Sequence, residues 1–307
     1  MTAILVTGAT GKQGGSVVRN LLTRNAPFDI LAVTRSAQSA SAQKLAKQSP
    51  KIKLVEGNLD DPAGIFRNAR SKTSSEIWGV FSVQAADPKS DTERRQGIVL
   101  IDESIKQGVK FFVYSSVDRG GDTRSFNNPT QVPHFIYKHE IEQHLIAKPK
   151  DTPPPSGSGM NWTILRPTAF FDNMTPDYFG KVFATAWQMS LKGKPLQLIA
   201  TTDIGFFAGE AFMKPKEWSG RALALAGDEL TYEEMERIFK AKTGKEVPTT
   251  FRIPVRLMMM MVKELGIMFK WFYDEGYGAH VAALREIHPE LKDFGAWLET
   301  ESGFKKV

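Results

Sequence analysis

The first half of the chain alternates short apolar runs with longer stretches in which apolar residues recur at helical spacing. The runs that we expect to form strands are Ala3–Gly8, Ile30–Arg35, Ile52–Gly57, Trp78–Val83, Lys110–Ser116 and Asn161–Pro167. The segments between them include Gly15–Arg24 and Gln96–Gln107, whose pattern predicts helices. Near-continuous apolar strands that alternate with helices are typical of a parallel sheet covered on both faces. Because crossovers between parallel strands are right-handed, we predict an α/β protein with a doubly wound parallel sheet.

The pattern changes after Pro167, where strand-like runs give way to segments rich in Phe, Trp and Met. Met258–Gly278 is the densest of these and predicts helices. Such residues pack a core, and they also suit the wall of a pocket for a flat, hydrophobic ligand. We therefore expect two domains, residues 1–167 with the sheet and residues 168–307 as a smaller, mostly helical part, and leave open a return of the chain to the sheet. The Pro, Ser and Gly residues of Lys148–Gly159 predict an exposed loop.

Glycines recur at every third position just after the first expected strand. The turn comprises Gly8, Ala9, Thr10, Gly11, Lys12, Gln13 and Gly14, and it opens the first expected helix. Glycines allow a tight turn, close approach of the backbone to a pyrophosphate, and close packing of the helix on the strand. Free amides at the start of the helix bind phosphate. Because a strand precedes the turn and a helix follows it, the pattern predicts a dinucleotide-binding domain of the Rossmann type.

The end of the second expected strand indicates which dinucleotide binds. Proteins that bind NAD usually place a carboxylate there, which accepts a hydrogen bond from the ribose 2′-hydroxyl. Here the residues are Val33, Thr34, Arg35 and Ser36, with no acid among them. The guanidinium of Arg35 suits a 2′-phosphate, and Ser36 offers a further donor. We therefore predict NADP(H) as the cofactor.

The composition narrows the classes of site and partner. The 307 residues include no cysteine, which excludes disulfides and thiolate metal ligands. The net charge of +6 comes from scattered Lys and Arg, and no nucleic-acid-binding motif is present, so we do not expect direct contact with nucleic acid. The N-terminus resembles no signal peptide, and no apolar run reaches the roughly 20 residues that span a bilayer. We therefore expect a cytoplasmic or nuclear protein without membrane association.

Several motifs make the chain similar to the NmrA-like family, an atypical branch of the short-chain dehydrogenases/reductases. They are GATGKQGGSVVRNLL, the VTR after the second strand, EGNLDDP, VYSSVDR, PHFIYKHEIEQHL and WTILRPTAFFDNM. A later stretch, WSGRALALAGDELTYEEM, resembles the strand and helix of the family's second domain. The resemblance covers most of the chain and is most specific in the N-terminal half.

The resemblance also implies which residues contact the cofactor. The family's glycine loop falls on Gly8 to Gln13, and its 2′-phosphate arginine falls on Arg35. Lys138 would bind the nicotinamide ribose. The other implied contacts flank the adenine, follow the fourth strand or lie over the nicotinamide, and they are Asn58, Leu59, Gln84, Ala85, Phe170, Phe171, Asp172 and Asn173.

The catalytic pattern of conventional short-chain reductases is incomplete in this chain. Those enzymes use Tyr-x-x-x-Lys on a helix, where a four-residue step puts both side chains on one face. Here the pair is His134-x-x-x-Lys138, and Tyr137 points about 100° away from Lys138 on a helix. Three interpretations stay open. His134 is the proton donor, or Lys138 is the acid/base, as the isoflavone-reductase-like relatives imply, or the protein only binds NADP(H).

Other polar residues near this helix have two interpretations each. Ser115 and Ser116 end the fifth expected strand, where they either orient a substrate carbonyl or bond the backbone, and we include Ser116 among the catalytic candidates. His134 follows a proline and could instead cap the helix. His139 and His144 resemble a zinc motif, but their five-residue separation places them about 140° apart on a helix, so we predict no metal site.

These observations lead to two hypotheses about function. The first is an NADPH-dependent oxidoreductase that acts on a C=O, C=C or C=N bond of a hydrophobic small molecule. The second is a non-catalytic NADP(H) redox sensor that regulates a transcription factor or another protein, for which the missing tyrosine is the supporting feature. We favour the enzyme, and the sequence does not identify its substrate, its oligomeric state or a protein partner.

Overall fold

The computed structural model describes residues 2–87, 90–151 and 159–304, which form two compact units. The first unit consists of Met1–Ser116, Tyr137–Leu165 and Ile204–Ala222. The second consists of Val117–Ile136, Arg166–Asp203 and Leu223–Val307. A single boundary at residue 167 is therefore a simplification of the real division. The chain leaves the first unit once before that point, and it returns to the sheet afterwards, which the sequence left open.

A seven-stranded sheet forms the centre of the first unit, in the order β3-β2-β1-β4-β5-β6-β9. Its strands are β1 (Thr2–Val6), β2 (Phe28–Thr34), β3 (Ile52–Glu56), β4 (Glu76–Ser82), β5 (Phe111–Ser115), β6 (Asn161–Pro167) and β9 (Arg221–Leu225). Neighbouring strands from β1 to β6 pair in parallel. The order reverses at β1, which is the arrangement of a Rossmann sheet and confirms the predicted fold class.

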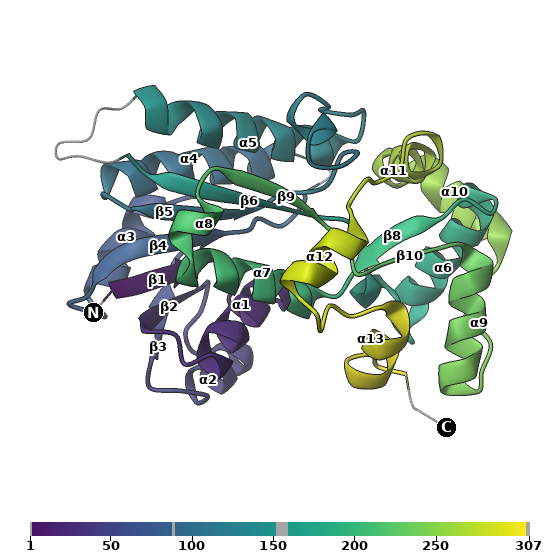
Figure 1. Ribbon diagram of the computed structural model, residues 1–307, viewed down its shortest axis with the longest axis horizontal. Coiled ribbons are helices and arrows are strands. Elements are labelled where there is room, and N and C mark those ends of the chain that lie inside the picture. Colours follow the sequence, from purple (N-terminus) through teal and green to yellow (C-terminus); the bar gives the residue numbers. More distant parts are fainter. Residues whose placement is uncertain (1, 88–89, 152–158, 305–307) are drawn as a thin grey trace. The chain divides into compact units, whose positions relative to one another are not determined.

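Helices cover both faces of this sheet, as a doubly wound fold requires (Figure 1). They are α1 (Lys12–Thr23), α2 (Ala40–Ala46), α3 (Pro62–Arg70), α4 (Thr92–Lys106), α5 (Pro133–Asp151), α7 (Thr201–Met213) and α8 (Pro215–Trp218). Helices α4 and α5 lie over one face, and α1 and α7 lie over the other. On the α7 side, the ring of Phe212 meets Trp78 and Phe111 edge to face, with centroids 6.5 and 6.2 Å away. These aromatic contacts attach the returning segment to the sheet.

The second unit combines helices with a three-stranded sheet in the order β10-β8-β7. Its elements are η1 (Arg124–Phe126), β7 (Ala169–Phe170), η2 (Phe171–Asn173), α6 (Tyr178–Leu191), β8 (Leu196–Ile199), β10 (Asp228–Leu230), α9 (Tyr232–Thr243), α10 (Arg252–Met261), α11 (Lys263–Asp274), α12 (Val281–Ile287) and α13 (Phe294–Thr300). The core of this unit is rich in aromatic residues, including Trp187, Phe269 and Trp271. The predicted helical character of Met258–Gly278 is realised as the end of α10 and the whole of α11.

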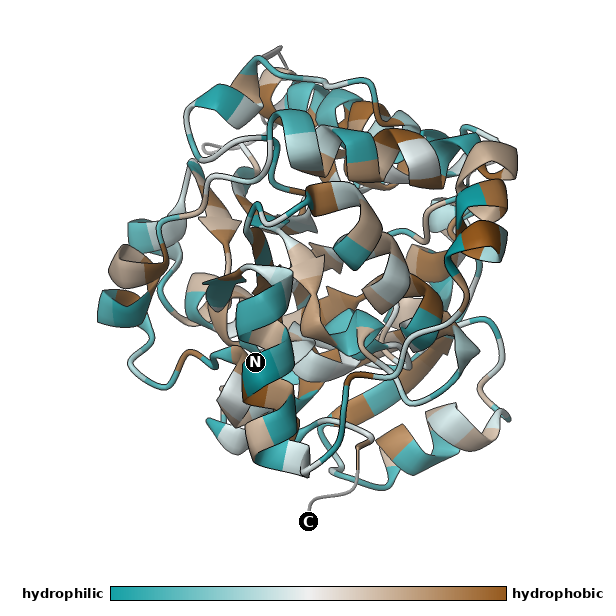
Figure 2. Cartoon of the chain, turned by 90° about the vertical axis from the view of Figure 1, so that its right-hand side faces the viewer, coloured by the Kyte–Doolittle hydropathy of each residue, from teal (hydrophilic) through white to brown (hydrophobic). Residues whose placement is uncertain are grey.

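One strand expected in the second domain belongs to the large sheet instead. The stretch WSGRALALAG forms β9, which lies beside β6, whereas the DEL that follows forms β10 in the small sheet. The next helix begins as its sequence predicts, because Thr231 and Glu234 form a reciprocal capping box at the start of α9. Figure 2 shows that the helices carry both hydrophilic and hydrophobic residues, as expected where one side packs on a core.

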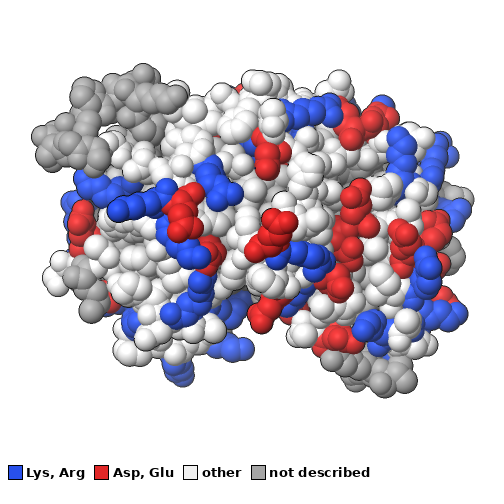
Figure 3. Space-filling model, viewed as in Figure 1, with Lys and Arg blue, Asp and Glu red and all other residues white. Residues whose placement is uncertain are grey.

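Two segments rich in Gly and Pro, residues 119–133 and Lys148–Gly159, differ in structure. Residues 119–132 are irregular apart from η1, as their Gly, Asn and Pro content predicts, and Pro133 begins α5. Helix α5 continues through Asp151, so the first part of Lys148–Gly159 is helical, and residues 152–158 lie outside the described part of the chain. Across the described residues, no helix is both long enough and apolar enough to cross a membrane. On the face in Figure 3, acidic and basic side chains are interspersed.

Candidate cofactor and catalytic site

The glycine turn joins the end of β1 to the start of α1. Gly8 has a φ of 59°, a left-handed backbone conformation that residues other than glycine rarely adopt. A Cβ on Gly14 would lie 2.4 Å from the carbonyl oxygen of Gly8, because α1 packs directly on the turn. Both positions therefore require glycine, one for backbone conformation and the other for space.

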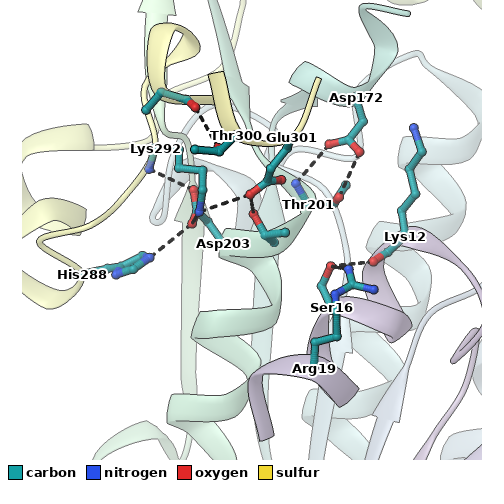
Figure 4. Close-up of polar contacts among 12 residues, drawn as sticks. Lys12, Ser16, Arg19, Asp172, Thr201, Asp203, His288, Lys292, Thr300 and Glu301 are labelled. Carbon is teal, nitrogen blue, oxygen red and sulfur yellow. Dashed lines mark hydrogen bonds and ion pairs between the residues drawn. The ribbon is translucent and has the colours of Figure 1, made fainter. Parts of the chain in front are cut away.

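The first turn of α1 offers amide groups that no side chain caps. Its N-cap residue, Gly11, has no side chain to cap with, and the first turn contains no acidic residue. Gly11 and its neighbours Thr10 and Lys12 are exposed, whereas Ala9 is buried. Further along the helix, the hydroxyl of Ser16 donates to the carbonyl of Lys12, away from these amides (Figure 4). Uncapped amides at a helix N-terminus with no competing carboxylate fit the phosphates of a dinucleotide.

The turn after β2 presents Arg35 and Ser36 to solvent. A side-chain hydrogen bond stabilises this turn, in which the hydroxyl of Thr34 donates to the backbone carbonyl of Ser36 at 3.1 Å. The carboxylate of Glu56, at the end of β3, accepts a hydrogen bond from the amide of Ala37 at 3.1 Å. Glu56 is not among the predicted site residues, since only strand pairing reveals that it braces this turn.

Two adenine candidates, Asn58 and Leu59, follow β3, and two further cofactor candidates, Gln84 and Ala85, follow β4. Asn58 is exposed, Leu59 is half-buried, and the side-chain carbonyl of Asn58 accepts a hydrogen bond from the amide of Asp60. Gln84 is 5% exposed, and its amide nitrogen donates to Ser82 at 2.9 Å. Within the described residues its amide oxygen has no hydrogen-bond partner. A buried acceptor without a donor is costly, so this atom fits a donor group on a ligand. Ala85 beside it is exposed.

Ser115, the last residue of β5, and Ser116 after it each form a hydrogen bond with a side chain of a helix. The hydroxyl of Ser115 donates to the side-chain oxygen of Gln13 in α1 at 2.5 Å. The hydroxyl of Ser116 donates to the carboxylate of Glu142 in α5. Both serines and Glu142 are buried. Gln13 therefore joins the glycine turn to β5.

Lys138 forms an ion pair with a buried acid that was not predicted from the sequence. Its ammonium lies 2.8 Å from a carboxylate oxygen of Glu93, in the first turn of α4. The side chain of Glu93 is wholly buried, whereas that of Lys138 is 11% exposed. The ammonium also lies 3.5 Å from the carbonyl oxygen of Ser115 and 5.9 Å from the ring centre of Tyr114. Glu93 lies before Gln96–Gln107, the segment that the sequence predicts as a helix, so only the packing of α4 on α5 reveals the pair.

His134 belongs to the second unit and has a partner there. Its Nδ1 pairs with the carboxylate of Glu264, in the first turn of α11. Its ring also packs edge to face on Phe135, with centroids 4.6 Å apart. His134 is thus engaged by a side chain of another helix, and the hypothesis of a helix cap receives no support from its described contacts. A histidine with a carboxylate on one ring nitrogen keeps the other nitrogen for proton exchange.

The motif after β6 divides into a structural part and a more accessible part. Phe171 is completely buried and stacks on Trp297, with centroids 5.7 Å apart and planes 28° apart. Its side chain is therefore part of the core of the second unit. Asp172 accepts hydrogen bonds from the amide and hydroxyl of Thr201. Phe170 and Asn173 are half-buried.

A buried charged network lies in the second unit, and no sequence motif predicts it. Asp203 is 1% exposed and pairs with His288 at 3.2 Å and with Lys292 at 3.4 Å (Figure 4). Lys292 also pairs with Glu301 at 3.2 Å. Burial lowers the pKa of Lys292, but the charges of Asp203 and Glu301 outweigh it, and the net pKa is raised. The network ties the C-terminal segments to the start of α7.

The false zinc motif separates into two unrelated contacts. His144 pairs with Asp102 at 2.7 Å, and His139 lies 3.4 Å from the side-chain amide of Gln143. Over the described residues, no group of three or more His, Cys, Asp or Glu side chains is arranged to hold a metal ion.

Comparison with known proteins gives a family and a fold. The model of the NmrA-like family matches residues 1–298. The NmrA-like family domain-containing oxidoreductase FrzB of Cladobotryum sp is 33% identical over 271 residues, which cover 79% of this chain and 74% of FrzB.

Two solved structures share the fold. Triphenylmethane reductase of Citrobacter sp., complexed with NADP(H), has a TM-score of 0.71 and 15% identity and covers 97% of this chain and 99% of its own. NmrA, a negative transcriptional regulator in complex with NADP, has a TM-score of 0.64 and 15% identity and covers 98% of this chain and 95% of its own. Since the family model spans almost the entire chain, this protein belongs to the NmrA-like family.

Proposed function

We propose that this protein is an NADP(H)-dependent oxidoreductase that acts on a C=O, C=C or C=N bond of a hydrophobic small molecule. The observation that carries the proposal is the uncapped, acid-free first turn of α1. The exposed Arg35 after β2 adds a cation where a 2′-phosphate would be recognised. The name of FrzB, an oxidoreductase, and the NADP(H) bound to triphenylmethane reductase support the same assignment.

Several residues of the first unit would hold the cofactor. The amides in the first turn of α1 would bind its pyrophosphate, since the N-cap residue Gly11 makes no side-chain cap. Arg35 would pair with the 2′-phosphate in a bidentate manner. The buried oxygen of Gln84 would accept a hydrogen bond that the described residues leave unmade. These donors and acceptors match the chemistry of a phosphorylated dinucleotide.

Side chains of this protein would bind the cofactor and donate a proton to the substrate. The nicotinamide supplies the hydride when the cofactor is bound. The ammonium of Lys138 carries three donors, so it can hydrogen-bond the ribose and also a developing charge on the substrate. His134, oriented by Glu264, is a second candidate for donating a proton. Ser116, which follows β5 and donates a hydrogen bond to Glu142, is the third catalytic candidate.

A second candidate function is a non-catalytic redox sensor. The observation that favours it is the absence of tyrosine at position 134, where a histidine already pairs with Glu264. NmrA is described as a negative transcriptional regulator, and it shares this fold. A sensor requires that NADPH and NADP⁺ bind with different affinities, because only a differential affinity can shift a conformational equilibrium.

The test begins with calorimetric titration of NADPH, NADP⁺ and NADH into the full chain and into Arg35→Gln. A lost charge-assisted pair costs about 1.5–3 kcal/mol, so we expect Arg35→Gln to bind NADPH roughly 10- to 100-fold more weakly and NADH unchanged. Arg70→Gln is the matched control, because Arg70 is an exposed arginine on α3 of the same unit. Equal loss in both variants, or tighter binding of NADH than of NADPH, contradicts the cofactor assignment.

Turnover then separates the two functions. NADPH oxidation is followed by absorbance against quinones, enones, imines and aromatic carbonyls. Turnover of any of these classes supports the oxidoreductase. Tight binding without turnover, together with a clear difference in affinity between NADPH and NADP⁺, supports the sensor.

A further inference from the structure

The ion pair between Glu93 and Lys138 is the most deeply buried charged contact at the candidate site. Glu93 has a side chain with no exposed surface, and its carboxylate lies 2.8 Å from the ammonium of Lys138. Apart from this ion pair, neither carboxylate oxygen has a hydrogen-bond partner among the described residues. Glu93 therefore depends on one cation, and that cation is the lysine that the family resemblance places at the nicotinamide ribose.

The other contacts of Lys138 are weaker than this pair. The carbonyl of Ser115 lies at 3.5 Å, which is the limit of a hydrogen bond, and the ring of Tyr114 lies at 5.9 Å. A long lysine side chain loses considerable rotamer entropy when it is fixed. A buried carboxylate at 2.8 Å supplies the attraction that offsets this loss, since a pair removed from water is screened little by salt. Glu93 is thus the group that determines where the ammonium lies.

We propose that Glu93 is the positioning residue of Lys138. The carboxylate anchors the ammonium from the buried side, so that its remaining donors face the exposed side of the lysine. The inference rests on the proposed function, because it assigns Lys138 to the bound cofactor. Glu93 itself has no surface through which it could touch a ligand, so it acts through the lysine. The N-terminal turn of α4 supports a carboxylate at this position through the helix dipole.

A variant that removes Lys138 affects folding and activity at the same time. Removing the lysine leaves Glu93 buried and unpaired, which destabilises a fold strongly, so lost activity in Lys138→Ala reports folding as well as chemistry. The experiment therefore uses Glu93→Gln, Glu93→Asp, Lys138→Met and the double variant Glu93→Gln/Lys138→Met in the full chain. NADPH affinity is measured by calorimetry, and stability is measured separately by thermal unfolding.

Positioning predicts a specific pattern of NADPH affinities. Glu93→Gln weakens NADPH binding about tenfold, within the range found for coupled neighbours. The double variant binds no more weakly than Lys138→Met alone, because the carboxylate acts only through the lysine. Glu93→Asp keeps the charge and restores most of the affinity lost in Glu93→Gln. If Lys138→Met does not fold, Glu93→Gln and Glu93→Asp still carry the test.

A carboxylate on the same helix provides the control. Glu103 in α4 has a side chain that is 11% exposed and pairs with the exposed Lys106 at 3.6 Å. Glu103→Gln removes a carboxylate from α4 without touching the lysine of the site, so its NADPH affinity matches that of the unaltered protein.

Two results overturn the proposal. In the first, Glu93→Gln lowers the melting temperature and leaves NADPH affinity unchanged, which is the behaviour of a purely structural pair. In the second, the losses of affinity in the single variants add in the double variant. Both results leave NADPH binding by the unaltered protein intact and so spare the proposed function. Failure of the unaltered protein to bind NADPH contradicts the proposed function and removes this inference with it.

Discussion

The two units place their functional residues by different physical means. In the first unit, the candidate residues lie on a backbone turn, at strand ends and in buried polar pairs such as Lys138–Glu93. In the second unit, the motif after β6 contributes Phe171 to an aromatic core that also includes Trp297 and Phe294. A turn and a strand end are specified locally by sequence, whereas a core is specified by many distant contacts. Motifs therefore predict chemistry more directly in the first unit than in the second.

The largest expected effect concerns the stability of the aromatic core in the second unit. Phe171→Ala removes a completely buried ring that contacts both Trp297 and Phe294, and we expect a loss of about 3–5 kcal/mol of unfolding free energy. Urea denaturation measures this loss. Phe170→Ala is the control, because Phe170 is only half-buried and should cost less. If Phe171→Ala weakened NADPH binding while leaving stability unchanged, Phe171 would be a ligand contact after all and the contrast between the units would fail.

The fold and the glycine turn were predictable because their determinants are local. Apolar runs give buried strands, and the turn from Gly8 to Gly14 needs only its own backbone geometry. Arg35 was predictable for the same reason, since it follows β2 directly in the chain. The brace that Glu56 provides for that turn was not, because it depends on the pairing of β2 with β3.

Other features of the site depend on packing between elements far apart in the chain. Glu93 and Lys138 meet because α4 lies beside α5 on one face of the sheet, and nothing in either local sequence encodes that meeting. The family motif identifies the segment Phe170–Asn173, and a motif does not say which of its side chains, such as that of Phe171, pack into a core. The single boundary at residue 167 was too simple because Ile204–Ala222 packs on the large sheet through contacts such as Phe212 with Trp78.

A smaller effect is expected in the first unit, where the glycine turn is determined by backbone geometry. Gly14→Ala places a Cβ 2.4 Å from the carbonyl oxygen of Gly8, so we expect a loss of about 1–3 kcal/mol from overpacking. Gly11→Ala is the matched variant, since its Cβ would lie 3.2 Å from the same oxygen and Gly11 is exposed. It should cost little stability and still weaken NADPH binding, because its Cβ projects from the phosphate-binding turn. Denaturation and calorimetry on both variants separate the two roles, and equal destabilisation by both would show that the turn is not limited by space at Gly14.

The smallest effect concerns a buried charge of the first unit that lies away from the site. The hydrogen bond from Lys53, at 2.7 Å, holds the pKa of Asp29 below its ordinary value of 3.8, and Thr73 and Ser75 act in the same direction while burial opposes them. The unfolded chain therefore binds this proton at a higher pH than the folded chain does. The stability that Asp29 contributes is complete above its unfolded pKa and is lost as the pH falls through its folded pKa. We expect Asp29→Asn to cost about 1–2 kcal/mol at pH 6 and progressively less below pH 4, as measured by urea denaturation at each pH. A cost that stayed constant down to pH 3 would mean that the hydrogen bonds of Asp29, rather than its charge, stabilise this part of the sheet.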